Sequence, residues 1–151
     1  MTIYYDSAVL VKAYCLETTS SQALSLIRRA SPPLLFTPLH AIEIRNALRL
    51  KRYRKELNEF QLRGALANLE ADINSGFFQV FDQDLRAVFD QAEILSATHT
   101  AVTGARCLDI LHVAAALLLG ARQFVSFDRR QRSLATRVGL KLLPRNLPKP
   151  A

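Results

Sequence analysis

Half of the 151 residues are apolar, 22% are charged, and the net charge at pH 7 is +7. This composition excludes a disordered chain, and the length suits one domain with its own core. No apolar run approaches the ~20 residues of a membrane-spanning helix, and no signal peptide is apparent, so we expect a cytoplasmic protein of a single domain over residues 1–151 without membrane contact.

Short apolar runs, rich in β-branched and aromatic residues, recur along the chain and are bounded by Pro, Gly, Asn or Asp. They cover residues 2–5, 34–37, 77–81, 123–127 and 141–143. Because they are apolar on both faces, they are typical of strands in a parallel sheet that helices cover.

Helix signals fill the segments between these runs. We expect helices from Ser7 toward Cys15, from Ser20 or Ser21 toward Arg29, over 39–52, after Asn58, after Asp82 or Asp84, over 107–119 and over 129–138. Asn58 with Gln61 forms an Asn variant of the capping box, and Gly120 and Gly139 end the last two helices. The alternation predicts an α/β fold, a three-layer α/β/α sandwich with a central parallel sheet of four to five strands, followed by a short Pro-rich tail at about 144–151.

Several classes of function lack their motifs. No Gly-rich loop is present, which argues against P-loop and Rossmann nucleotide binding. Cys15 and Cys107 are far apart without metal-ligand spacing, so we expect reduced thiols in the core. The pI near 9.9 favours a polyanionic partner such as nucleic acid.

Four carboxylates stand at positions where such folds place their sites. Asp6 and Asp128 directly follow the first and fourth predicted strands, so both are expected at the carboxyl edge of the sheet. Glu43 lies about one turn into the helix after the second strand, and Asp109 lies in the first turn of the apolar segment 107–119. Clustered carboxylates repel one another unless a cation offsets them, and oxygen ligands suit Mg²⁺ or Mn²⁺.

Each acid also has a simpler interpretation. Asp6 and Asp128 can cap the helices that follow them, and Glu43 and Asp109 can be first-turn acids favoured by the helix dipole. For Asp109 we expect the compensating charge to be a divalent cation shared with the other three acids, not a salt bridge along its own helix. The combination, not any single acid, indicates a metal site.

Three stretches, "IYYDSAVLVKAY", "TPLHAIEIRNAL" and "RCLDILHVAAALLLGARQFVSFD", carry a resemblance that spans nearly the whole chain. In order and spacing the chain resembles PIN-domain ribonucleases, particularly the VapC-type toxins of prokaryotic toxin–antitoxin pairs. The matching positions are Asp6 with Ser7, Glu43, Asp109 with His112, Ala114 and Ala116, and Ser126 with Asp128. Two departures are mild: Ser126 stands where Thr is commoner, and Ile110 and Leu111 follow the third acid.

The resemblance implies a metal-dependent endoribonuclease that cleaves RNA phosphodiesters with a metal-activated water. It implies that Asp6, Glu43, Asp109 and Asp128 hold Mg²⁺ or Mn²⁺ and form the catalytic site. It further implies a homodimer and inhibition by a cognate antitoxin protein.

Other side chains are candidates for supporting roles. Ser7 and Ser126 can orient carboxylates, although a plain cap or strand-end hydroxyl explains them equally well. His112 shares a helix face with Asp109, and a buried histidine bonded to a neighbour is the favoured interpretation.

A basic segment is a candidate RNA-binding surface. Arg45, Arg49 and Arg52 form a stripe after Glu43, and Lys12 is a further candidate. A solvated helix face is the competing interpretation of this stripe.

Two competing functions come from other classes. A non-catalytic PIN-like module that binds RNA or a protein would bind RNA without cleaving it. An aspartyl-phosphate phosphotransferase would require Asp-x-Asp after the first strand, and Ala8 stands at the second position.

Overall fold

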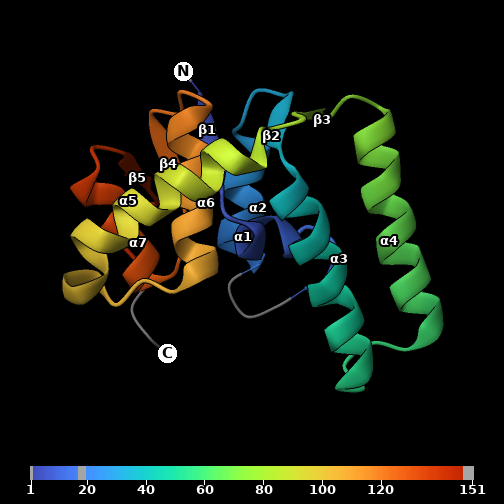
Figure 1. Cartoon of the computed structure of the whole chain (residues 1–151). Helices are drawn as coiled ribbons and strands as arrows, with labels where there is room; N and C mark the ends of the chain where they lie inside the picture. Colours follow the sequence, from blue (N-terminus) through green and yellow to red (C-terminus); the bar gives the residue numbers. More distant parts are fainter. Residues whose placement is uncertain (1, 17–19, 148–151) are drawn as a thin grey trace. The chain divides into compact units, whose positions relative to one another are not determined.

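The computed structural model describes residues 2–16 and 20–147 (Figure 1). The chain divides into two compact units, one made of residues 1–6 and 83–151 and the other of Ser7–Asp82. Each unit is α/β, with parallel strands and its own helices. Within the described ranges, no helix is long and apolar enough to cross a membrane.

The first unit is built on a three-stranded parallel sheet of order β1-β4-β5. Its strands are β1 (Ile3–Tyr5), β4 (Gln123–Val125) and β5 (Lys141–Leu143), and its helices are α5 (Leu85–Thr103), α6 (Cys107–Leu118) and α7 (Arg129–Arg137). Tyr4 pairs with Phe124 in the sheet, and their rings stack with centroids 5.5 Å apart. Helix α6 is buried from Asp109 to Ala116 and packs against both α5 and α7, which explains why its sequence is apolar on all sides.

In its described residues, the second unit contains a pair of parallel strands and four helices. The strands are β2 (Leu34–Phe36) and β3 (Phe78–Val80), and the helices are α1 (Ser7–Val11), α2 (Ser20–Arg28), α3 (Pro38–Tyr53) and α4 (Glu59–Asn74). Helices α3 and α4 lie side by side and connect the two strands (Figure 1). The capping box predicted from Asn58 and Gln61 is present at the start of α4, with the Gln61 backbone N–H donating to Asn58 Oδ1 at 2.8 Å.

The structure confirms the predicted α/β class and the parallel pairing of strands at all five expected positions. Backbone hydrogen bonds divide these strands into sheets of three and two. Helix α1 is shorter than expected and ends at Val11, because the chain continues as a turn in which Tyr14 N–H donates to Val11 C=O at 2.9 Å. The end of the Pro-rich tail, residues 148–151, lies outside the described residues, and the single-domain organisation stays a prediction.

The cysteines differ in part from expectation. Both are free thiols, but Cys107 is exposed and Cys15 is only partly buried. Cys107 is the first residue of α6, two residues before the buried part of that helix begins at Asp109.

Candidate functional site

Asp6 and Asp128 lie at the carboxyl edge of the three-stranded sheet. The backbone N–H of Asp6 donates to Val125 C=O at 2.9 Å, which continues the β1–β4 pairing by one residue. Asp128 follows the end of β4 by three residues. Parallel strands end at a common edge, so the two acids emerge from neighbouring strands on the same side, as predicted.

Asp128 is held by the turn between β4 and α7. Its backbone N–H donates to Ser126 Oγ at 3.1 Å, and Ser126 is completely buried. Its Oδ1 caps α7 by accepting from the N–H groups of Arg130 and Gln131, both at 2.9 Å. The cap therefore uses one carboxylate oxygen of Asp128, whereas the other, Oδ2, lies near the guanidinium of Arg106.

Asp109 has that same partner, Arg106. The backbone N–H of Arg106 donates to Asp109 Oδ2 at 3.0 Å, and its Nε lies 3.2 Å from the same oxygen. Only 12% of the Asp109 side chain is exposed, so this charge is mostly removed from water. We expected the charge of Asp109 to be compensated without a salt bridge along its helix. That expectation was wrong, because Arg106, three residues earlier, forms an ion pair with Asp109.

Arg106 also lies near a second acid of the first unit, Asp128. Its Nη2 lies 3.7 Å from Asp128 Oδ2. The pKa of Arg106 is raised, first by the hydrogen bond to Asp109 and the charge of that acid, then by the charges of Asp128 and Asp6. Asp109 and Asp128 therefore share one guanidinium, and Asp6 is joined to Asp128 through Gln131, which bonds to both carboxylates. We call Asp6, Asp109 and Asp128 the acidic trio.

The donor chemistry of the trio suits a hard divalent cation. Carboxylate oxygens are the ligands that Mg²⁺ and Mn²⁺ prefer. Yet among residues 2–16 and 20–147 no group of three or more potential ligand residues is arranged closely enough to hold a metal ion. The trio thus has the composition of a metal site, with the Arg106 guanidinium supplying the positive charge.

Glu43 and Ser7 belong to the second unit. Glu43 lies on α3, one residue before the fully buried Ile44, and Ser7 is the buried first residue of α1, adjacent in sequence to Asp6. The participation of Glu43 as a fourth acid, and of Ser7 as a support, stays a prediction.

The predicted RNA-binding residues differ in exposure. Lys12 is only 8% exposed, so it does not lie on an open surface. Arg45 binds Glu70, with Nη2 and Oε1 2.5 Å apart, and Arg52 Nε lies 3.6 Å from Glu59 Oε2. Arg49 is exposed and forms no ion pair within the described part of the chain. Of the stripe on α3, Arg49 is therefore the residue best placed to meet a phosphate.

His112 is a buried structural residue, as the favoured interpretation predicted. It is 1% exposed, and its Nδ1 lies 2.8 Å from the hydroxyl of Tyr4. The bond connects α6 to β1. Asp109 lies on α6 and Asp6 directly follows β1, so the bond helps to fix the positions of both acids.

Arg132 stabilises the same edge without reaching the acids. Its guanidinium donates to the carbonyl oxygens of Ser126, Pro144 and Arg145. Burial lowers the pKa of Arg132. Although it follows Asp128 by four residues, Arg132 binds backbone carbonyls after β4 and β5, whereas the side-chain ion pair of Asp128 is with Arg106.

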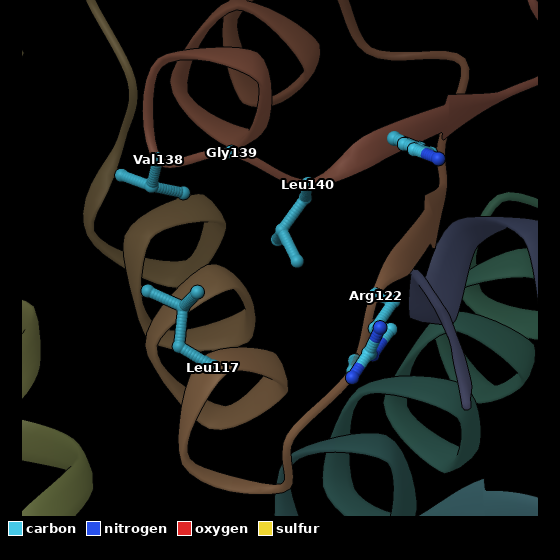
Figure 2. A pocket seen from close by; sticks show the side chains of 7 residues that line it. Leu117, Arg122, Val138, Gly139 and Leu140 are labelled. Carbon is cyan, nitrogen blue, oxygen red and sulfur yellow. The ribbon is translucent and has the colours of Figure 1, made fainter. Parts of the chain in front are cut away.

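A pocket of about 340 Å³ lies elsewhere in the first unit. The side chains of Leu117 and Leu140 face it (Figure 2), and Arg122 and Lys141 also line it. Arg122 precedes β4 and Lys141 begins β5, so the pocket lies at the amino ends of these parallel strands. It is therefore separate from the acidic trio, which lies at the carboxyl ends.

Comparison with known proteins identifies a structural likeness. The chain is similar to the crystal structure of FitAcB from Neisseria gonorrhoeae, with a TM-score of 0.65, 16% sequence identity, and coverage of 93% of this chain and 96% of that chain. The protein has a PIN-like α/β fold. No family model matches the sequence, and no curated protein matches it.

Two residues of this site, Arg106 and Gln131, were not predicted from the sequence. Arg106 had an available signal, since an arginine three residues before a helix-start aspartate is at salt-bridge spacing. Gln131 had none beyond its place three residues after Asp128, because only the fold brings it to Asp6, 125 positions earlier in the chain.

Proposed function

We propose that this protein is a Mg²⁺- or Mn²⁺-dependent endoribonuclease and the toxin of a prokaryotic toxin–antitoxin pair. The observation that carries the proposal is the chain of contacts that joins Asp6 to Asp128 through Gln131, and Asp128 to Asp109 through Arg106, beside the carboxyl edge of a PIN-like sheet. The likeness to FitAcB supports the biological context, because FitAcB is a toxin–antitoxin complex whose FitB chain is a PIN-domain protein. A VapC-type identity, a homodimer and a cognate antitoxin belong to the same proposal.

The three acids of the trio would bind the cation together and position the substrate beside it. When bound, the cation supplies a low-pKa water and neutralises charge on the phosphodiester. Asp6 and Asp109 are nearly buried, so they keep the cation in a setting where its charge is weakly screened. Asp128 is more exposed and retains Oδ2 for the site, while Oδ1 caps α7. Glu43 is proposed as the fourth acid.

The test is RNA cleavage with purified single variants. Asp6→Asn and Asp109→Asn remove one charge each while keeping side-chain size, so we expect cleavage to fall by about 100-fold or more in each. The matched control is Asp90→Asn, which changes an exposed acid that pairs with Arg86 on α5 and should cleave normally. Undiminished cleavage by both site variants, with native circular dichroism, contradicts the proposal.

A second candidate function also rests on an observation. Arg106 already compensates two of the acids, and no preformed metal cluster is found in the described ranges, so a non-catalytic RNA- or protein-binding module fits the same geometry. The two functions differ in their response to a chelator. EDTA should abolish cleavage by the nuclease, whereas a binding module retains RNA in EDTA and does not cleave RNA whichever metal is added.

A further inference from the structure

Gln131 connects two of the three acids. It lies in the first turn of α7 and is 1% exposed. Its backbone N–H donates to Asp128 Oδ1 at 2.9 Å, and its side-chain Nε2 donates to Asp6 Oδ1 at 3.3 Å. A single residue thus fixes the carboxylates that follow β1 and β4.

The other end of the same amide has no partner. Gln131 Oε1 is buried without a hydrogen bond in the described part of the chain. Reversing the amide would not relieve this, because Oε1 would then meet the carboxylate of Asp6, acceptor against acceptor. The bond to Asp6 therefore fixes the orientation and leaves a buried oxygen that requires a donor or a cation.

The charge of the site favours a cation and a neutral amide. Asp6, Asp109 and Asp128 together carry three negative charges when ionised, and Arg106 supplies one positive charge. A divalent cation brings the balance to neutrality. An amide oxygen is a hard ligand that adds coordination without a further negative charge, which a glutamate at the same place would add.

We propose that Gln131 belongs to the divalent-cation site, where Nε2 positions Asp6 and Oε1 donates its lone pair to the cation or to a water of its hydration shell. This inference rests on the proposed function insofar as it requires a cation at the acidic trio. It goes further by assigning a role to a residue that carries no charge and lies outside the acidic set.

The experiment measures Mn²⁺ binding by calorimetry, and thermal unfolding in EDTA and in saturating Mn²⁺. Gln131→Met keeps the length and removes both polar atoms, so we expect Mn²⁺ affinity to fall about tenfold to 100-fold. It removes the unsatisfied buried oxygen and also the Nε2 bond to Asp6, and these two effects oppose each other, so Tm in EDTA should change little. Gln131→Glu keeps an oxygen and adds a charge, so Tm in EDTA should fall and the rise in Tm on adding Mn²⁺ should exceed that of the wild type.

Gln79→Met is the matched control, since Gln79 is exposed on β3 and should leave both measurements unchanged. A purely structural Gln131 gives a different pattern, with both variants less stable in EDTA and Mn²⁺ affinity within about twofold of the wild type. That pattern overturns the inference while leaving the nuclease proposal intact. A wild-type protein that binds no Mn²⁺ overturns both, whereas weak Mn²⁺ binding by Gln131→Met in a protein that cleaves no RNA supports the inference and removes the nuclease.

Discussion

The guanidinium of Arg106 lies 3.2 Å from the carboxylate of Asp109 and 3.7 Å from that of Asp128, so these acids have a positive charge beside them without any metal. A divalent cation at the same carboxylates carries charge of the same sign as Arg106. The divalent cation and the Arg106 guanidinium therefore repel each other, so the ion pairs of Arg106 with the acids lower the affinity of the acids for the cation, and a bound cation weakens those ion pairs. Arg106 is largely exposed, which limits the size of this effect through solvent screening.

We predict that Arg106→Gln strengthens Mn²⁺ binding, with half-saturation at a concentration about fivefold lower than in the wild type. The variant should also unfold at a lower temperature in EDTA, because the acids then repel one another without compensation. Calorimetric titration with Mn²⁺ checks the first effect and thermal denaturation the second. Arg86→Gln, which breaks the exposed Arg86–Asp90 pair on α5, is the control, and equal Mn²⁺ affinities in all three proteins would refute the competition.

The basic stripe on α3 contains one arginine without an ion pair in the described residues. We predict that Arg49→Gln weakens RNA binding and reduces the slope of log affinity against log salt by about 0.7, the value for one lost phosphate contact on a single strand. Fluorescence anisotropy over a range of KCl concentrations measures this slope. Arg45→Gln should change it less, because Glu70 already pairs with Arg45; a larger effect at Arg45 than at Arg49 contradicts the assignment.

The bond between Tyr4 and His112 is buried, and its removal should be costly. We predict that Tyr4→Phe lowers the free energy of unfolding by about 1–3 kcal/mol, since His112 Nδ1 then loses its bond to the hydroxyl inside the core. Urea denaturation measures the loss, and an unchanged m-value shows that both states keep their compactness. Tyr53→Phe removes a hydroxyl from a residue that is 84% exposed and should be neutral.

In the second unit, Tyr14 donates a hydrogen bond to Asp72 Oδ2 at 2.5 Å. The pKa of Tyr14 is raised above its ordinary value of 10.0, first by burial, then by the hydrogen bond and charge of Asp72. Below pH 10 the phenol is protonated in both the folded and the unfolded state, so Tyr14 makes its full contribution to the free energy of unfolding. Above pH 10 the unfolded chain loses this proton first, so the stabilisation declines as the pH rises.

We predict that Tyr14→Phe reduces the loss of stability above pH 10. The difference in slope should be at most about 1 kcal/mol per pH unit, below the full value for one proton because Tyr14 is partly exposed. Urea denaturation between pH 9 and pH 11 on both proteins measures it. Parallel stability curves for the two proteins would show that Tyr14 does not titrate differently in the folded state.

The N-terminal cap of α4, formed by Asn58, was predicted from the sequence and can be tested by substitution. Asn58→Ala removes the acceptor for the Gln61 N–H, so we predict a loss of about 1 kcal/mol in the free energy of unfolding. Asn68→Ala, at an exposed position inside the same helix, should be neutral or slightly stabilising because alanine has the higher helix propensity. Equal effects of the two substitutions would mean that the cap contributes nothing.

Local chemistry made much of the fold predictable from the sequence. The strand positions followed from short apolar runs between turn residues, and the caps at Asn58 and Asp128 followed from side chains that accept hydrogen bonds from nearby N–H groups. These features depend on residues within about four positions of one another. The positions of Asp6 and Asp128 were also predictable from local sequence, because each acid comes shortly after the end of a predicted strand.

Relationships between distant residues were decided only by the tertiary structure. The Gln131–Asp6 contact spans 125 positions and arises because β1 and β4 are neighbours, which no pattern in either segment specifies. Burial of Lys12 and exposure of Cys107 depend likewise on what packs around each side chain. Sequence alone determined which acids stand at helix starts and strand ends; the fold decided that a guanidinium and a buried amide meet them there, because side chains far apart in the chain share an environment only after packing.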